Sequence, residues 1–266
     1  MCPAARRRLL LALLPLLALA APPRHRPAAA QPAAGAEIRV LSAGAVEPGL
    51  KAAVARFRAG GGGGDAAVRV AYATAPQIRE RLAAGGETPD LLIAPVMLIN
   101  DLASAGRLAG ERTTLGRVGI GVAVRADAPA VPEIGDIAAL KRALEGAERV
   151  VFNRASTGLY LERLFERMGL TAAIAPKAVR TATGAEVMRH LAEGTGREIG
   201  LGPITEVLME PGVRLVGPLP AEAQNHTAYA ASLMPGAAPA AAALLEFLAG
   251  PEGRAAFARA GIEPVP

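Results

Sequence analysis

The sequence has few of the residues that build metal centres and aromatic sites. It contains one cysteine, three histidines and no tryptophan, and aromatic residues make up only 3% of the chain. No spaced cluster of cysteine and histidine is present, so we expect no metal ion and no cofactor. Sugars and quaternary amines are commonly held by aromatic side chains, and the low aromatic content argues against a site for them.

Sequence motifs of common enzymes are also missing. The chain has no G-x-S-x-G, no H-E-x-x-H and no phosphate-binding loop. His190 lies on an expected helix and His226 beside an expected strand crossing, and we interpret both as structural or surface residues. Glu162, Glu166 and Glu186 lie on expected helices, where acids usually form a solvated face. We therefore expect no catalytic residues and no enzymatic activity.

The first thirty residues have the pattern of a secretory signal peptide. Three arginines, Arg6 to Arg8, precede an apolar run from Leu9 to Ala20, which small residues follow. The run is too short for a comfortable membrane span. We expect residues 1–30 to be a signal peptide cleaved after Ala20 or Ala30, with an uncleaved anchor as the alternative, and a periplasmic location for the mature protein.

Cleavage would change the charge of the chain. The full sequence has 29 basic and 24 acidic residues, and five of the arginines precede Ala30, so cleavage there leaves 24 of each kind. The pI of about 10.0 then belongs largely to the leader. We therefore expect no nucleic-acid partner. Cys2 is lost with the leader, which leaves no disulfide and no thiol in the mature chain.

From Glu37 onward a repeated pattern predicts an α/β fold. Short β-branched or apolar segments alternate with loops of small residues and with amphipathic helices, which is typical of a mostly parallel sheet flanked by helices. Asp136 stands where it would cap a helix. The expected strands are residues 38–41, 68–72, 91–94, 150–152, 178–180 and 199–201.

Two longer β-prone segments, residues 117–129 and 226–234, interrupt this pattern. We interpret them as crossings between two lobes. Lobe 1 would be discontinuous and contain residues 37–120 with 228–266, whereas lobe 2 would contain residues 124–223. This arrangement predicts a ligand cleft between the lobes, in a protein that we expect to be a monomer.

Five loops between a strand and a helix are rich in small or hydroxyl residues. In open α/β sheets such loops lie at the carboxyl ends of the strands, where ligands bind. Helix N-termini there provide unpaired N–H groups and partial positive charge. One such loop would be an ordinary turn, but five together predict a shared pocket for a small anion. The loops are SAGAVEP (42–48), ATAPQ (73–77), NRASTG (153–158), TATGAE (181–186) and GPITE (202–206).

These loops supply the candidate ligand-binding residues. Ser156 and Thr157 are the strongest hydroxyl donors, although either residue could instead cap its own helix. Arg154 would add a charge-assisted contact to a carboxylate or an oxyanion, with a solvated surface arginine as the alternative. The full set is Ser42, Gly44, Ala45, Thr74, Ala75, Asn153, Arg154, Ser156, Thr157, Thr183, Gly184, Pro203 and Thr205.

Five segments distributed over nearly the whole mature chain are similar to those of a known family. They are LSAGAVEPGLKAAVARF, TPDLLIAP, RVGIGVAVRADAP, STGLYLERLFERMGL and VGPLPAEAQNHTAYAASLM. In their order and spacing the chain resembles the molybdate-binding proteins of ABC importers and, more widely, type II periplasmic substrate-binding proteins. The resemblance implies two lobes that close on a small anion, with molybdate or tungstate as the default, and delivery of that anion to an ABC permease in the inner membrane.

Three positions depart from that family. Its first-loop serine falls at Ala45, its second-loop serine at Pro76, and its pocket tyrosine near Pro203. Proline has neither a hydroxyl nor an N–H to donate, and a tetrahedral dianion with fewer donors is harder to desolvate. A different oxyanion or a small carboxylate contacted by Arg154 is therefore an open alternative. A sensor protein, or a periplasmic enzyme that acts on a small acid, would also account for these features.

Overall fold

Strands and helices alternate along most of the chain. The computed structural model describes residues 37–265 except 62, 65, 86–87 and 130–131, so the expected signal peptide lies outside the described residues. The strands are β1 (Glu37–Ala43), β2 (Ala67–Ala73), β3 (Leu91–Pro95), β4 (Ala109–Arg125), β5 (Arg149–Asn153), β6 (Ala178–Thr181), β7 (Glu198–Pro203), β8 (Val213–Pro218) and β9 (His226–Leu233). The helices are α1 (Glu47–Ala59), α2 (Ala75–Ala83), α3 (Val96–Ser104), α4 (Ile137–Gly146), α5 (Ser156–Arg167), α6 (Thr171–Ile174), α7 (Gly184–Glu193), α8 (Ile204–Met209), α9 (Pro239–Ala249) and α10 (Pro251–Arg259), with a short 3₁₀ turn, η1 (Gly44–Val46), before α1.

The described strands form a mixed sheet in the order β2-β1-β3-β9-β4-β7-β5-β6, with β8 beside β4. β1 is parallel to β2 and β3, and β5 is parallel to β6 and β7. Every antiparallel pair among the described strands includes β4 or β9, the two long segments predicted as crossings. The predicted α/β class is therefore confirmed, and the crossing strands are what make the sheet mixed.

β4 connects two halves of this sheet. Up to Gly119 it pairs with β9, and from Ile120 onward it pairs with β7 and β8. We call β1, β2, β3 and β9 the first half, and β5, β6, β7 and β8 the second half. The predicted lobe boundaries stay a prediction, because the described residues group as one compact unit.

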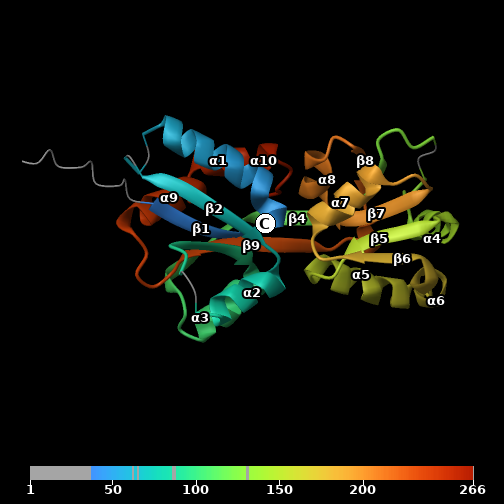
Figure 1. Cartoon of the computed structure of the whole chain (residues 1–266), viewed down its shortest axis with the longest axis horizontal. Coiled ribbons are helices and arrows are strands. Elements are labelled where there is room, and N and C mark those ends of the chain that lie inside the picture. Colours follow the sequence, from blue (N-terminus) through green and yellow to red (C-terminus); the bar gives the residue numbers. More distant parts are fainter. Residues whose placement is uncertain (1–36, 62, 65, 86–87, 130–131, 266) are drawn as a thin grey trace, which may run out of the picture. The chain divides into compact units, whose positions relative to one another are not determined.

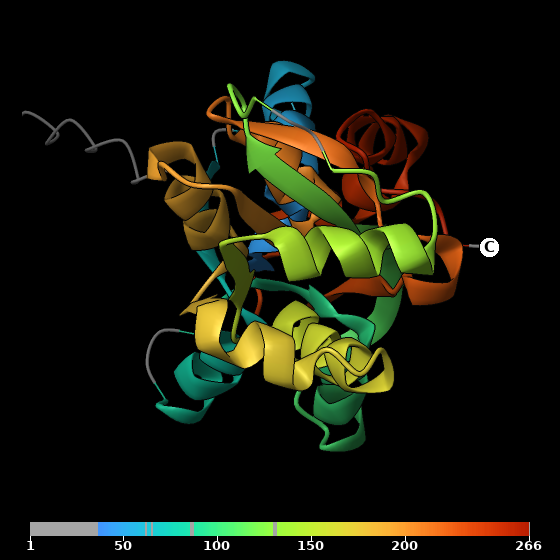
Figure 2. The same cartoon turned by 90° about the vertical axis from the view of Figure 1, so that its right-hand side faces the viewer.

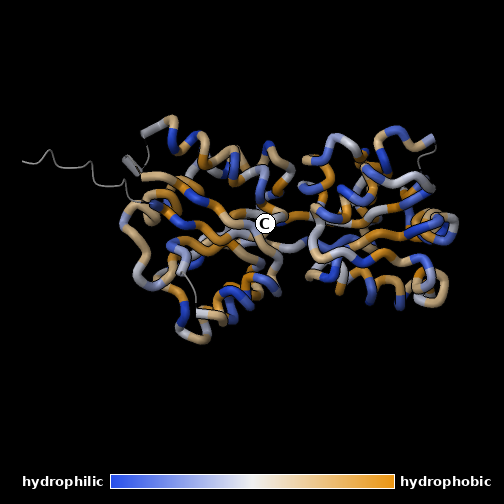
Figure 3. Tube along the Cα trace, in the orientation of Figure 1, coloured by the Kyte–Doolittle hydropathy of each residue, from blue (hydrophilic) through white to orange (hydrophobic). Residues whose placement is uncertain are grey.

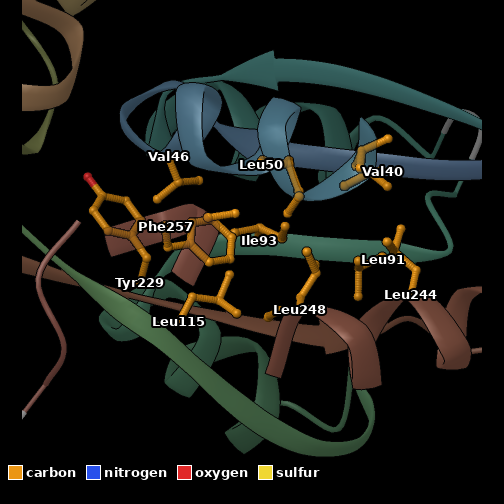
Figure 4. Packing of buried hydrophobic residues seen from close by; sticks show 14 of the residues in the cluster. Val40, Val46, Leu50, Leu91, Ile93, Leu115, Tyr229, Leu244, Leu248 and Phe257 are labelled. Atoms are coloured by element: carbon orange, nitrogen blue, oxygen red, sulfur yellow. The ribbon is translucent and has the colours of Figure 1, made fainter. Parts of the chain in front are cut away.

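Alternate residues of each strand face opposite helix layers, as the two-residue period of a strand requires. In β1, Val40 belongs to the core cluster under α1, α9 and α10, and the next residue, Leu41, to the cluster under α2 and α3. In β5, Val150 and Phe152 pack with α4 and α5, whereas Val151 packs with α7 and α8. Figures 1 and 2 show helices on both faces of the sheet, and Figure 4 shows the cluster around α1.

Local sequence signals agree with the observed helices. The Asp136 carboxylate accepts a hydrogen bond from the Ala139 N–H at 2.7 Å and caps α4, as predicted. Figure 3 shows hydrophobic residues concentrated in the strands, while most helices alternate between hydrophobic and hydrophilic positions. No helix in the described part of the chain is long and apolar enough to cross a membrane.

Besides β4, which runs from Ala109 to Arg125 rather than over residues 117–129, two features differ from the predicted elements. β1 continues beyond its predicted end, because Ser42 and Ala43 pair with Tyr72 and Ala73 of β2. β8 is absent from the prediction; its segment, VRLVGP, is only partly buried and pairs with β4 alone, so its hydrophobic pattern is weak. The first difference matters for the site, since it places Ser42 inside a strand.

Candidate ligand-binding site

The five predicted loops meet at one pocket of about 270 Å³. The first turns of η1–α1, α2, α5, α7 and α8 line it, so both halves of the sheet contribute walls. Each of these turns has backbone N–H groups without a helical partner and carries partial positive charge. The predicted residues that line the pocket are Gly44, Ala45, Thr74, Ala75, Asn153, Ser156, Thr157, Thr183, Gly184 and Pro203.

Three of the candidate residues lie away from the pocket. Ser42 is fully buried in β1, and its hydroxyl donates to the Ala43 carbonyl at 3.1 Å. Thr205 is also buried, and its hydroxyl donates to the Ala45 carbonyl at 2.6 Å, which links α8 to the turn after β1. Arg154 is exposed and does not line the pocket. Arg154 therefore contributes no side chain to the described pocket wall.

Asn153 holds the start of α5 in place. Its Oδ1 accepts hydrogen bonds from the N–H groups of Ala155 at 2.9 Å and Gly158 at 3.1 Å. A Cβ atom at Gly158 would lie 1.7 Å from the Asn153 carbonyl oxygen, so only glycine fits there. This turn places Ser156 at the pocket wall as the first residue of α5, and Thr157 beside it.

The threonines of two other loops serve as helix caps. The Thr183 hydroxyl accepts from the Glu186 N–H at 3.2 Å and caps α7. The N–H and the hydroxyl of Thr74 both donate to the Gln77 side-chain oxygen, at 2.8 and 3.1 Å, at the start of α2. The Thr74 hydroxyl thus donates locally, whereas the Thr183 hydroxyl accepts and keeps its own proton. Backbone N–H groups and the hydroxyls of Ser156, Thr157 and Thr183 are the donors that these loops offer a ligand.

The pocket is also lined by two tyrosines, Tyr72 and Tyr229, which the sequence analysis did not select as ligand-binding residues. The Tyr72 hydroxyl is buried and has no hydrogen-bond partner in the described part of the chain. The Tyr229 ring packs in the core cluster of Figure 4, where its hydroxyl points away from the packed side chains. Burial raises the pKa of both phenols, with the charge of Glu47 adding for Tyr72 and that of Glu206 for Tyr229. Both therefore stay neutral. Both lie in segments that the sequence predicts as β-prone, and the only signal for Tyr72 is its place just before a small-residue loop.

Glu206, in the first turn of α8, is the second finding that sequence reasoning missed. Its Oε2 is buried and has no hydrogen-bond partner among the described residues. The carboxyl packs directly on backbone, since a Cβ atom at Gly184 would lie 1.6 Å from Oε2 and one at Gly44 3.1 Å from Oε1. Burial raises the pKa of Glu206 to about 7, and the charge of Glu47 adds to this. The GPITE loop contains this residue, but the search for hydroxyl donors selected Thr205 instead.

The described residues that line the pocket include acidic and apolar side chains but no basic ones. Among the described residues that line it there is no lysine, arginine or histidine, although three glutamates are present, Glu47, Glu206 and Glu210. Glu47 is paired with Lys51, and Glu210 accepts from the Gly212 N–H at 3.2 Å. The described residues include no group of acids, histidines and cysteines suited to a metal ion. The apolar part of the wall includes Ala43, Ala73, Pro95, Met188 and Met209.

A pocket lined by helix starts from both halves of a sheet is typical of solute-binding proteins. The chain belongs to the family of bacterial extracellular solute-binding proteins, whose model matches residues 38–263. The resemblance to type II periplasmic substrate-binding proteins of ABC importers is thereby confirmed.

Similar proteins differ in what they bind. The chain is 32% identical over 243 residues to a Pseudomonas sp. protein named aconitate isomerase, a match that covers 90% of this chain and 91% of the relative. The periplasmic molybdate-binding protein of Azotobacter vinelandii has a TM-score of 0.69 and 16% identity, over 86% of this chain and 99% of that one. The sulfate-binding protein SubI of Mycobacterium tuberculosis has a TM-score of 0.68 and 18% identity, over 86% and 87%. At these identities the two structures show a common fold and leave the ligand undecided.

Proposed function

We propose that this chain is the exported solute-binding protein of an ABC importer and that its ligand is a small carboxylic acid. The observation that carries the proposal is the composition of the pocket wall. Helix starts and neutral hydroxyl donors face apolar side chains, with no basic residue among the described lining residues. Such a wall suits a ligand that has both charged ends and a carbon skeleton.

A bare oxyanion suits this wall less well. Molybdate presents oxygen atoms on every side, and the methyl and thioether groups of Ala73, Met188 and Met209 cannot hydrogen bond to them. Repulsion from an ionised Glu206, roughly 4 kcal/mol for a ligand charge about 4 Å away at an effective dielectric constant near 20, applies to both kinds of anion and does not separate them. An organic acid keeps its carboxylates at the helix starts and its carbon atoms on the apolar residues. The relative named for aconitate, an unsaturated tricarboxylic acid, supports this choice.

The cellular setting of the proposal follows from the family and the leader. We expect residues 1–30 to direct export to the periplasm, where the monomeric protein would pass its ligand to a permease in the inner membrane. Binding by closure of the two halves around the pocket would be the mechanism, since residues from both line it.

Thermal shift and calorimetry on the mature chain test the ligand class. The panel is cis-aconitate, trans-aconitate and the saturated tricarballylate, against molybdate, tungstate, sulfate and phosphate at matched ionic strength. The organic acids should raise the melting temperature progressively with concentration, as RT ln(1 + [L]/Kd) requires, whereas the inorganic anions should leave it unchanged. Stabilisation by molybdate or tungstate without any by the carboxylates would overturn the assignment.

A second candidate function is isomerisation of an unsaturated carboxylic acid. The observation that favours it is Glu206, a carboxyl in the pocket whose pKa is raised to about 7 and whose Oε2 has no partner among the described residues. Moving a double bond requires only the transfer of a proton between carbon atoms, and a carboxyl that titrates near neutrality is suited to this step. The relative named aconitate isomerase adds support.

Proton NMR in ²H₂O distinguishes the two candidates. An isomerase should convert cis-aconitate into the trans form, and Glu206→Gln should abolish conversion while binding persists. If cis-aconitate is recovered unchanged after incubation with enough protein to bind all of it, binding remains as the function. Loss of conversion together with loss of folding in the variant would be recognised from its circular dichroism.

A further inference from the structure

The carboxyl of Glu206 is held at the junction of several elements. α8 provides it, and the backbones of Gly44 in η1 and Gly184 in α7 pack against its two oxygens. Oε1 lies close to the Gly44 position, whereas Oε2 lies at Gly184 and lacks a protein partner in the described part of the chain. A shielded carboxyl oxygen without a partner is rare in folded proteins, and it indicates a group that is satisfied by something else.

The titratable groups around Glu206 do not neutralise it. α1 contributes Glu47, whose charge acts on Glu206 and which is itself paired with Lys51. β2 and β9 contribute the neutral phenols Tyr72 and Tyr229. α7 contributes Glu186, whose Oε2 accepts from the Ala182 N–H, and α8 itself contributes Glu210, which accepts from the Gly212 N–H. No basic side chain lines the pocket among the described residues, so no counter-ion there would hold Glu206 ionised.

An anionic ligand makes the ionised form of Glu206 still less favourable, since like charges in a poorly solvated site repel. A protonated carboxyl, in contrast, donates a hydrogen bond to a ligand carboxylate. We propose, on the basis of the proposed function, that Glu206 is protonated in the complex and donates this hydrogen bond, so that ligand binding takes up one proton. The protein is then a binder of carboxylates whose affinity falls as the pH rises, with Glu206 as the residue that sets this dependence.

Calorimetry with tricarballylate tests the proposal, because this saturated acid cannot be isomerised. Titrations at pH 8, in two buffers of different ionisation enthalpy, give the number of protons taken up. The carboxyl groups of the probe are ionised at this pH, and so is most of Glu206 in the free protein. The wild type should therefore take up close to one proton per ligand, and Glu206→Gln, which keeps a donor but cannot titrate, should take up none.

Affinity over a range of pH gives a second readout. Above pH 7 the wild type should lose up to about tenfold in affinity per pH unit relative to Glu206→Gln, while at pH 6 the two should agree within about threefold. Glu80→Gln, an exposed change on α2 outside the pocket, is the matched control and should behave as the wild type does.

The outcomes separate this inference from the proposed function. Binding with the same proton uptake in wild type and Glu206→Gln, or with no uptake in the wild type at pH 8, would overturn the role of Glu206 and leave a carboxylate-binding protein. No binding of tricarballylate or the aconitates at any pH from 6 to 9 would overturn both. The wild-type uptake is decisive even if the variant folds poorly.

Discussion

Asp90, before β3, and Glu206, at the start of α8, are two shielded carboxyls in opposite environments. Asp90 is 2% exposed and accepts four hydrogen bonds: from the Arg39 N–H at 2.8 Å, from its Nε at 3.0 Å and Nη2 at 3.3 Å, and from the Ala238 N–H at 3.0 Å. Burial alone would raise the pKa of Asp90, but these hydrogen bonds and the Arg39 charge hold it below its usual value. At Glu206 burial is uncompensated, and its pKa rises to about 7.

The difference separates a stabilising carboxylate from a functional one. The partners of Asp90 join β1, the segment before β3 and the segment before α9, so the residue connects parts of the first half of the sheet. Glu206 stabilises no described partner in its ionised form, although it occupies the pocket wall. A shielded group that costs stability and faces a pocket is a candidate for ligand recognition.

Asp90→Ala should give the largest effect on stability. It removes the acceptor of the Arg39 and Ala238 N–H groups and the carboxylate beside the Arg39 guanidinium, whose side chain is 34% exposed, so the cost should be about 3 kcal/mol, near the low end for a buried pair. Urea unfolding at pH 7 measures the loss. Asp101→Ala is the control, since its pair with Arg79 is exposed on both sides and should be worth less than about 1 kcal/mol. Equal losses in the two variants would contradict the structural role of Asp90.

The dependence of stability on pH should differ between the two carboxyls. Because the folded-state pKa of Glu206 is raised from 4.5 to about 7, its contribution is present below pH 4.5 and is lost as the pH rises through 7. Relative to wild type, Glu206→Gln should therefore gain up to about 3 kcal/mol of unfolding free energy between pH 5 and pH 8. Unfolding in urea at several pH values measures this gain.

Asp90→Asn serves as the comparison for that series. The pKa of Asp90 is lowered by folding, so its contribution is present above the unfolded-state value and is lost only as the pH falls through the folded-state value. The free energy of unfolding of Asp90→Asn should therefore lie below that of the wild type by the same amount from pH 5 to 8. If the Glu206→Gln difference were equally flat over that range, the two environments would not differ as described.

Gly184→Ala should weaken ligand binding at least tenfold, corresponding to about 1.4 kcal/mol or more. The added Cβ atom would lie 1.6 Å from Glu206 Oε2, so the carboxyl must move from its place in the pocket wall. Gly146→Ala at the end of α4 is the matched control, because nothing lies within 4 Å of its Cβ position. Calorimetry with tricarballylate measures both variants. Unchanged affinity in Gly184→Ala would show that Glu206 does not have to stay there for binding.

The sequence predicts which loops form the pocket better than it predicts the ionisation state of the side chains that line it. Strand and helix periodicity located the loops, because burial on two faces leaves a clear pattern in residues such as Val40 and Leu41. The carboxyl of Glu206 escaped prediction, since its environment depends on Gly44 and Gly184, which are far from it in the chain. Helical position alone makes such an acid look like part of a solvated face. Long-range packing, which the sequence pattern does not encode locally, decides the pKa of such a group.

Separate replacement of Arg154 and Ser156 compares a predicted ligand-binding residue that does not line the pocket with one that does. These two variants should have the smallest effects on ligand affinity. The sequence assigned a ligand contact to both residues, but only Ser156 lines the pocket, whereas Arg154 is exposed beside it. Ser156→Ala removes one neutral hydrogen bond, worth about 1 kcal/mol, and should weaken binding of tricarballylate about fivefold. Arg154→Ala should change the affinity less than about twofold, and should do so mainly at low salt, because a solvated charge near the pocket acts only through a screened field. A loss in Arg154→Ala that equals or exceeds the loss in Ser156→Ala, and that persists at high salt, would show that the guanidinium enters the pocket when the ligand binds.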